Sequence, residues 1–198
     1  MSFSPITEGD RGVFAIESAM SRVFDSTSLY GLGYFVVHLN NARFGVYARD
    51  ATALACSLDE VRERISQRGK HSAAEWNDLD AFAMAHAFRA AVYDPSLLIE
   101  PALAGRLEDF AAILRASKLM WAPDGDEAFD DGSYILQIDS GSMVRLIGFR
   151  AQDEAPGFDP GSLEEVVIPE SEFYGVLERW VSRFLSEWTR AEKESVGE

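Results

Sequence analysis

Hydrophobic and polar positions alternate with the two-residue period of a β-strand in several short runs of this chain. Such runs, rich in aromatic and β-branched residues, predict strands. They cover residues 13–18, 32–39, 43–48, 133–139, 143–149 and 164–169. Asn40-Asn41 joins one pair of runs and Ser140-Gly141-Ser142 joins another, so we expect two β-hairpins. A helix is the alternative for the first run, and the polar residues 1–11 predict an irregular lead-in.

Apolar residues recur every three to four positions in four other segments, and this period predicts helices. The segments cover residues 57–69, 75–93, 106–117 and 173–188. Ser57 followed by Glu60 matches a capping box at the start of the first helix, and Gly69 would end it. Asp94-Pro95 would end the second. The last segment keeps its apolar stripe for over four turns and predicts a long amphipathic C-terminal helix.

The order of these elements predicts an α+β fold. Strands come first, then helices, then strands again, and a final helix closes the chain. We expect a largely antiparallel sheet built from the two hairpins plus extra strands, packed against about four helices. No internal repeat and no long linker divides the chain, so residues 1–198 are expected to form a single α+β domain.

The balance of charges narrows the classes of partner. Thirty-three acidic residues against eighteen lysines and arginines give a formal net charge of -15. Such a surface repels nucleic acid and anionic lipid, so neither is expected as a partner, whereas a cationic partner would be attracted. A charge that serves only solubility is the alternative. One cysteine, no signal peptide and no apolar window of membrane length together predict a cytoplasmic protein.

The acidic residues concentrate between positions 121 and 172. This segment contains thirteen acidic residues and only two basic ones, both arginines. Five of the acids lie within eight residues just before the second hairpin, with Phe129 among them and Trp121 three positions before the first. Neighbouring carboxylates repel one another unless water or a positive partner compensates them. We therefore predict a partner-binding surface. It comprises Trp121, Asp124, Asp126, Glu127, Phe129, Asp130 and Asp131. For Phe129, burial in the core is an equal alternative.

Motifs for catalysis, metals and cofactors fail on their spacing. His38, His71 and His86 share no zinc-type spacing with one another or with Cys56, and His38 and His86 are expected to be core histidines. The acidic loop departs from the calcium-binding EF-hand pattern. Cys56 has small apolar neighbours, which favours a packed thiol over an activated one. We expect no catalytic residue, metal or cofactor; a small metal-assisted hydrolase that uses the loop carboxylates is the alternative.

Three segments carry a resemblance to a known family. They are residues 33–71 (GYFVVHLNNARFGVYARDATALACSLDEVRERISQRGKH), 121–149 (WAPDGDEAFDDGSYILQIDSGSMVRLIGF) and 173–188 (FYGVLERWVSRFLSEW). In these the chain resembles the Immunity protein 42 family of bacterial polymorphic toxin systems. The resemblance implies an α+β protein without catalysis. It would be encoded beside a secreted or contact-delivered toxin, which it would bind and neutralise in the cytoplasm of the producing cell.

Charge and resemblance together give a hypothesis for the mode of action. The acidic face built from residues 124–131 would dock on a basic toxin domain, and a nuclease would suit it because a nuclease must hold phosphates. The middle segment from Ala74 to Lys118 is the alternative interface, because each immunity protein must fit its own toxin. A regulatory or scaffold protein with an endogenous partner is a further alternative. The oligomeric state and the toxin itself stay open.

Overall fold

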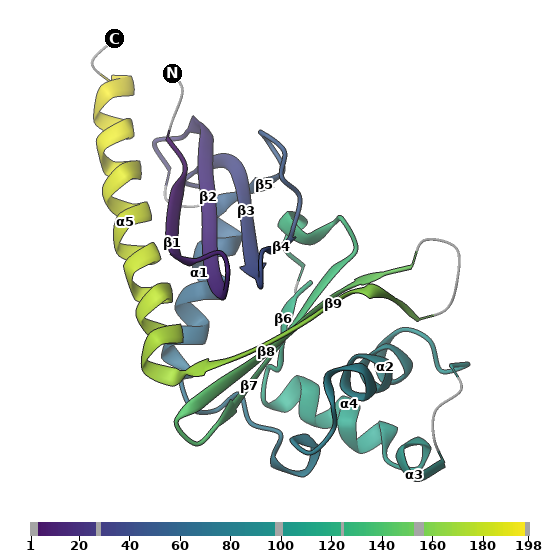
Figure 1. Cartoon of the computed structure of the whole chain (residues 1–198). Coiled ribbons are helices and arrows are strands. Elements are labelled where there is room, and N and C mark those ends of the chain that lie inside the picture. Colours follow the sequence, from purple (N-terminus) through teal and green to yellow (C-terminus); the bar gives the residue numbers. More distant parts are fainter. Residues whose placement is uncertain (1–3, 27–28, 98–100, 124, 153–156, 197–198) are drawn as a thin grey trace.

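The strands of the chain form two antiparallel sheets (Figure 1). The computed structural model describes residues 4–26, 29–97, 101–123, 125–152 and 157–196. The first sheet contains β1 (Ile6–Asp10), β2 (Phe14–Val23), β3 (Gly31–Leu39), β4 (Ala42–Phe44) and β5 (Thr52–Ala53). The second contains β6 (Met120–Ala122), β7 (Ser133–Ser140), β8 (Met143–Ala151) and β9 (Phe158–Pro169). Each expected hairpin therefore belongs to a different sheet.

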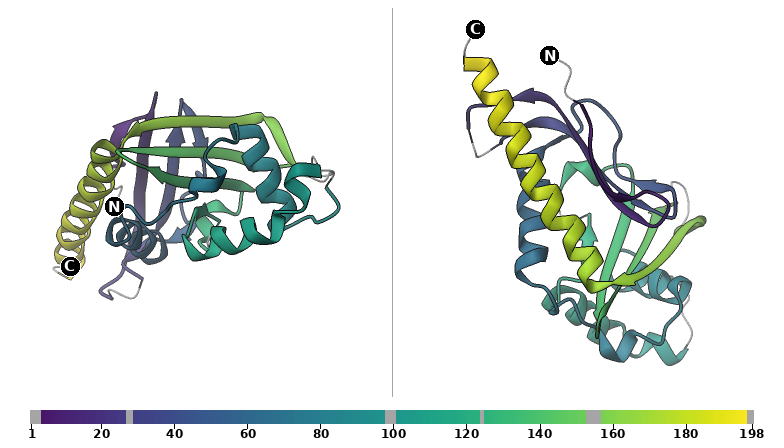
Figure 2. Two further views of the ribbon diagram at one scale, coloured as in Figure 1. Left: turned by 90° about the horizontal axis from the view of Figure 1, so that it is seen from below. Right: turned by 60° about the vertical axis from the view of Figure 1, so that its left-hand side comes forward.

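The described part of the chain also contains five helices. They are α1 (Leu54–Ser66), α2 (Ala81–Val92), the one-turn α3 (Pro101–Ala104), α4 (Leu107–Ala116) and α5 (Glu170–Val196). Two 3₁₀ turns, η1 (Ala74–Trp76) and η2 (Glu127–Phe129), complete the described elements. The long helix α5 runs along the first sheet, whereas α2 and α4 lie against the second (Figures 1 and 2). The α+β class, the antiparallel pairing and the long C-terminal helix are confirmed.

Several element boundaries differ from those expected, because contacts distant in sequence override the local pattern. The irregular lead-in is wrong from Ile6 onward, where β1 pairs antiparallel with β2. The capping box is also wrong: α1 already begins at Leu54, so Ser57 lies inside it and donates its hydroxyl to Asp126. The expected helix 75–93 divides into η1 and α2. Asp80 caps α2 by accepting the Ala83 N–H at 2.7 Å.

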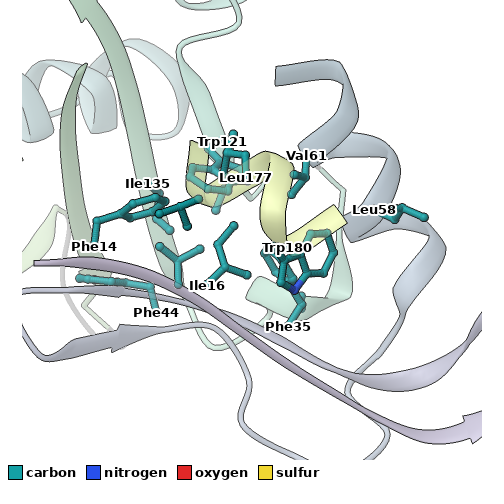
Figure 3. Packing of buried hydrophobic residues seen from close by; sticks show 14 of the residues in the cluster. Phe14, Ile16, Phe35, Phe44, Leu58, Val61, Trp121, Ile135, Leu177 and Trp180 are labelled. Atoms are coloured by element: carbon teal, nitrogen blue, oxygen red, sulfur yellow. The ribbon is translucent and has the colours of Figure 1, made fainter. Parts of the chain in front are cut away.

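The two sheets share one apolar core with α1 and α5. Ile16 and Phe35 come from the first sheet, Ile135 from the second, and Leu177 and Trp180 from α5 (Figure 3). All of these side chains are buried, so their contacts stabilise the association of the two sheets through the hydrophobic effect. The two sheets approach closely at Gly148 of β8, which has no side chain. A Cβ atom on Gly148 would lie 2.7 Å from the ring of Phe44.

The second sheet is buried on its other face as well. Tyr134, Leu136 and Phe149 pack there against Phe88 of α2 and Phe110 of α4. Successive residues of a strand point to opposite faces, so the uninterrupted burial of β7 from Ser133 to Asp139 matches a strand covered on both sides. The second sheet therefore forms the middle layer, between the helix pair α2–α4 and the first sheet with α1 and α5.

A buried arginine fixes α1 against this middle layer. Arg64 donates to the side-chain oxygen of Gln137 in β7 at 3.1 Å and to the carbonyls of Lys118 and Met120 at 3.3 and 2.5 Å. Its charge is compensated by Glu60 at 2.7 Å. A buried cation is tolerated only when paired and hydrogen-bonded in this way. The surface of α1 is thus held in one place beside the loop that follows β6.

Candidate partner-binding site

The two aromatic residues of the predicted site lie in the core. Trp121 is 1% exposed, and its ring centroid lies 6.2 Å from that of Phe14 and 5.9 Å from that of Phe173. Phe129 is 3% exposed and meets Phe35 edge to face at 6.2 Å. Of the two interpretations of Phe129, burial in the core is the one that holds. Both rings anchor the acidic loop from beneath.

Asp126 is buried too, at 6% exposure. One carboxylate oxygen accepts from the hydroxyl of Thr52 at 2.7 Å and from the N–H of Ala128 at 2.9 Å, and the other accepts from the hydroxyl of Ser57 at 2.5 Å. Three donors offset the cost of burying the carboxylate. Because the donors belong to β5, α1 and η2, this one side chain fixes the loop to both neighbouring elements.

The remaining described acids of the loop point outward. Glu127, Asp130 and Asp131 are exposed along and after η2. Asp131 accepts the N–H of Ser133 at 3.1 Å and lies 3.8 Å from the Arg150 guanidinium. Asp124 lies outside the described residues. The structure therefore gathers three of the predicted acids at the surface and sends Trp121, Asp126 and Phe129 inward.

A pocket of about 260 Å³ separates this loop from α1. Trp121, Phe129 and Phe35 line its apolar part. The charged residues that the structure describes in its lining are all acidic: Asp59, Glu60, Glu63 and Asp126. The pocket would suit a cationic side chain with an aliphatic stem, such as lysine or arginine.

The acids of α1 are the part of the site that sequence reasoning missed. Glu63 lies three residues after Glu60 and four after Asp59. This spacing places the three acids on adjoining parts of a helical surface. That spacing was the available signal, but it did not reveal that the helix would lie beside the loop. A hydrogen bond from Lys118 lowers the pKa of Glu63, which keeps this carboxylate charged.

Cys56 opens into the same pocket and is exposed, so the expectation of a packed thiol is wrong. Partial burial and the negative charges of Asp126, Asp59 and Glu127 raise the pKa of its thiol. A raised pKa disfavours the reactive thiolate. The helix N-terminus therefore does not activate this cysteine.

The histidines lie apart from the pocket. His38 is a core histidine, as predicted: its ring nitrogen Nε2 lies 3.0 Å from a carboxylate oxygen of the buried Glu17. His71 is also buried, and its Nδ1 lies 3.1 Å from the carbonyls of Ser117 and Lys118. His86 is half-buried on α2. Within the described residues, no group of three or more histidine, cysteine, aspartate or glutamate side chains is placed to hold a metal ion.

Comparison with known proteins identifies the family. The model of the family described as Immunity protein 42 matches residues 6–183. The chain belongs to the Immunity protein 42 family. The match confirms the resemblance carried by the three sequence segments, and it spans both sides of the pocket as well as the middle helices.

A solved structure shares the fold of this Immunity protein 42 chain. CdiI from Burkholderia dolosa AUO158 superposes with a TM-score of 0.54 at 16% sequence identity, over 90% of this chain and 99% of that chain. At so low an identity the likeness concerns the fold alone. A comparison with curated protein sequences gave no match. In the described part of the chain, no helix has the length and apolar character needed to cross a membrane.

Proposed function

We propose that this Immunity protein 42 chain neutralises a cognate toxin in the bacterial cytoplasm by stoichiometric binding, without catalysis. Membership of the family supports the role of immunity protein. The fold likeness to a CdiI protein supports a setting in which the toxin is delivered to neighbouring cells by contact. The toxin would be a protein domain with a basic surface, such as a nuclease.

The observation that carries this choice of partner is the acid-lined pocket between α1 and the loop. Asp59 and Glu63 of α1 line it, and Glu127, Asp130 and Asp131 are exposed in the loop whose Asp126 completes the lining. A lysine or arginine of the toxin would enter the pocket while the exposed acids meet further basic residues. The buried residues Trp121, Asp126 and Phe129 would act indirectly, by holding the loop in the shape that presents these charges.

Charge also sets an expectation for the kinetics of binding. A net charge of -15 accelerates encounter with a basic partner, and added salt screens this attraction. Charges at the rim of an interface act mainly on the association rate, whereas buried contacts act on dissociation. If the acidic face binds the toxin, the association rate should therefore decrease as the salt concentration rises.

The test uses the toxin domain encoded by the gene next to that of this chain. Titration calorimetry should show a one-to-one complex, and association kinetics should slow as salt rises to about 0.3 M. A triple variant, Glu127→Gln with Asp130→Asn and Asp131→Asn, should associate more slowly and depend less on salt. A control with the same change in charge combines Asp25→Asn, Glu172→Gln and Glu178→Gln, which are exposed acids on other elements. The control should keep most of the salt dependence.

Two outcomes separate the parts of the proposal. Absence of any complex with the neighbouring toxin domain at low salt would refute neutralisation by binding. A complex that forms normally with the triple variant, with unchanged salt dependence, would refute the acidic face while leaving the immunity role in place.

A further inference from the structure

A second pocket, of about 400 Å³, opens between α2, α4 and β6. Phe88 and Val92 of α2, Leu114 of α4 and Met120 of β6 supply most of its apolar lining. A concave apolar surface of this kind is the usual form of a site that receives an apolar group.

Part of this apolar surface is open to solvent at the C-terminal end of α2. Val92 on the pocket wall is 41% exposed. The exposed Tyr93 follows it, with its ring 5.8 Å from that of Phe88. Single exposed apolar residues are common on proteins, but Val92 also forms part of the wall of an apolar pocket, which gives its exposure a use in binding.

The charge of this pocket is opposite to that of the acidic one. Among the described residues, the charged side chains of its lining are those of Arg115 and Lys118. Lys118 is held in place from several sides. Its ammonium pairs with Glu63, its carbonyl accepts from Arg64, and its backbone takes a φ of 45°. Because Lys118 already pairs with Glu63, Arg115 is the cation that favours an occupant combining an apolar group with a negative charge.

The two pockets adjoin each other. Glu63 lines the acidic pocket and Lys118 lines the apolar one, and these two side chains form the ion pair that lies between them. Consecutive residues of β6 also separate them, because Trp121 lines the first pocket and Met120 the second. Successive residues of a strand point to opposite faces, so the pockets lie on opposite faces of the second sheet, on either side of its edge strand β6. A partner that extends across this edge and its ion pair would contact both pockets.

We infer that the pocket between α2 and α4 is a second anchor point for the toxin, and that it receives a large apolar side chain carried beside a carboxylate. This inference rests on the proposed function and specifies its partner more closely. The toxin surface would present a basic residue to the acidic pocket. On the far side of the Glu63–Lys118 ion pair, an apolar residue would enter the second pocket and its neighbouring carboxylate would meet Arg115. The alternation of charge would fix the orientation of the bound toxin.

The test measures binding of the same neighbouring toxin domain to wall variants of this pocket. Val92→Glu places a charge on the apolar wall and should weaken binding about tenfold or more, mainly through faster dissociation. Val167→Glu is the matched control, because Val167 is 53% exposed on β9 and lines neither pocket. Arg115→Glu should also weaken binding, and Arg115→Lys should retain it. Thermal unfolding confirms that each variant is folded.

The outcomes are distinct from those of the first proposal. If the wild-type chain binds the toxin domain and Val92→Glu and Arg115→Glu bind equally well, the second anchor is refuted and the acidic face is unaffected. Equal weakening by Val167→Glu and Val92→Glu also refutes it. If the wild-type chain binds no neighbouring toxin domain, the proposed function fails and the second anchor fails with it.

Discussion

The loop from Trp121 to Asp131 has an inner and an outer side with opposite chemistry. Inner residues Trp121, Asp126 and Phe129 are at most 6% exposed. The outer acids alternate with them in sequence yet lie at the surface. Acidic residues a few positions apart thus have different roles. Asp126 fixes the loop through three hydrogen bonds, whereas the charges of Glu127 and Asp130 lie exposed at the surface.

The difference follows from the cost of burying charge. A carboxylate removed from water is tolerated only where donors replace the water, and Asp126 has them from β5, α1 and η2. An exposed carboxylate needs no such donors and contributes little to folding. Stability should therefore respond to substitutions on the inner side and toxin binding to substitutions on the outer side. The following experiments test that separation.

The largest effect is expected from Trp121→Ala. Removing the fully buried indole leaves a cavity beside Phe14 and Phe173 and should lower the free energy of unfolding by about 3–5 kcal/mol. Urea denaturation followed by far-ultraviolet circular dichroism measures the loss, with Asp130→Ala as the exposed control. A loss below about 1 kcal/mol would contradict the anchoring role. One cooperative unfolding transition is expected for each variant, because both sheets share one apolar core.

The next effect is that of Asp126→Ala. This substitution leaves the hydroxyls of Thr52 and Ser57 and the N–H of Ala128 without their acceptor, which should cost about 1–3 kcal/mol. Hydrogen exchange should also accelerate in the loop, because its link to α1 and β5 is lost. Asp126→Asn keeps one acceptor oxygen and should recover part of the stability. If Asp126→Ala and Asp130→Ala proved equally harmless, the division into an inner and an outer side would be wrong.

Lowering the pH should destabilise the protein through its buried histidines and not through the outer acids. Burial lowers the pKa of His38 and of His71, so both stay neutral in the folded protein at a pH where the unfolded chain already binds protons. The folded protein keeps its full stability above pH 6.5, the pKa of an unfolded histidine, and loses stability as the pH falls below that pKa. Urea midpoints between about pH 7.5 and 5.5 measure the slope. His38→Gln should reduce it, and the triple variant of the outer acids should leave it unchanged.

The smallest effect on stability is expected from the outer acids themselves. Glu127→Gln and Asp130→Asn should each change the free energy of unfolding by no more than about 0.5 kcal/mol. Asp131→Asn keeps an acceptor for the Ser133 N–H and loses only the solvent-screened contact with Arg150, so it should be similarly mild. Melting temperatures measure all three. A large destabilisation by any of them would show that the outer side also holds the fold.

The hairpins and the final helix could be predicted because their signals are local. The run 133–139 starts where β7 starts, and the Asn40-Asn41 turn has positive φ at both residues, as such a turn requires. The burial of Asp126 was beyond local reasoning, since its hydroxyl donors stand 74 and 69 positions away. For the same reason the contribution of α1 to the pocket could not be seen in advance. β1 gave no signal of its own, because its polar sequence becomes a strand only by pairing with β2.

Arg64 has a further consequence, for self-association. β6 lies at an edge of the second sheet, and such an edge offers free backbone groups on which a strand from another molecule can pair. The carbonyl of Leu119 accepts from Gln137 of β7, whereas those of Lys118 and Met120 are taken by the Arg64 guanidinium. One side chain from α1 thereby occupies two backbone acceptors that a strand from a second copy would need in order to pair at this end of the edge.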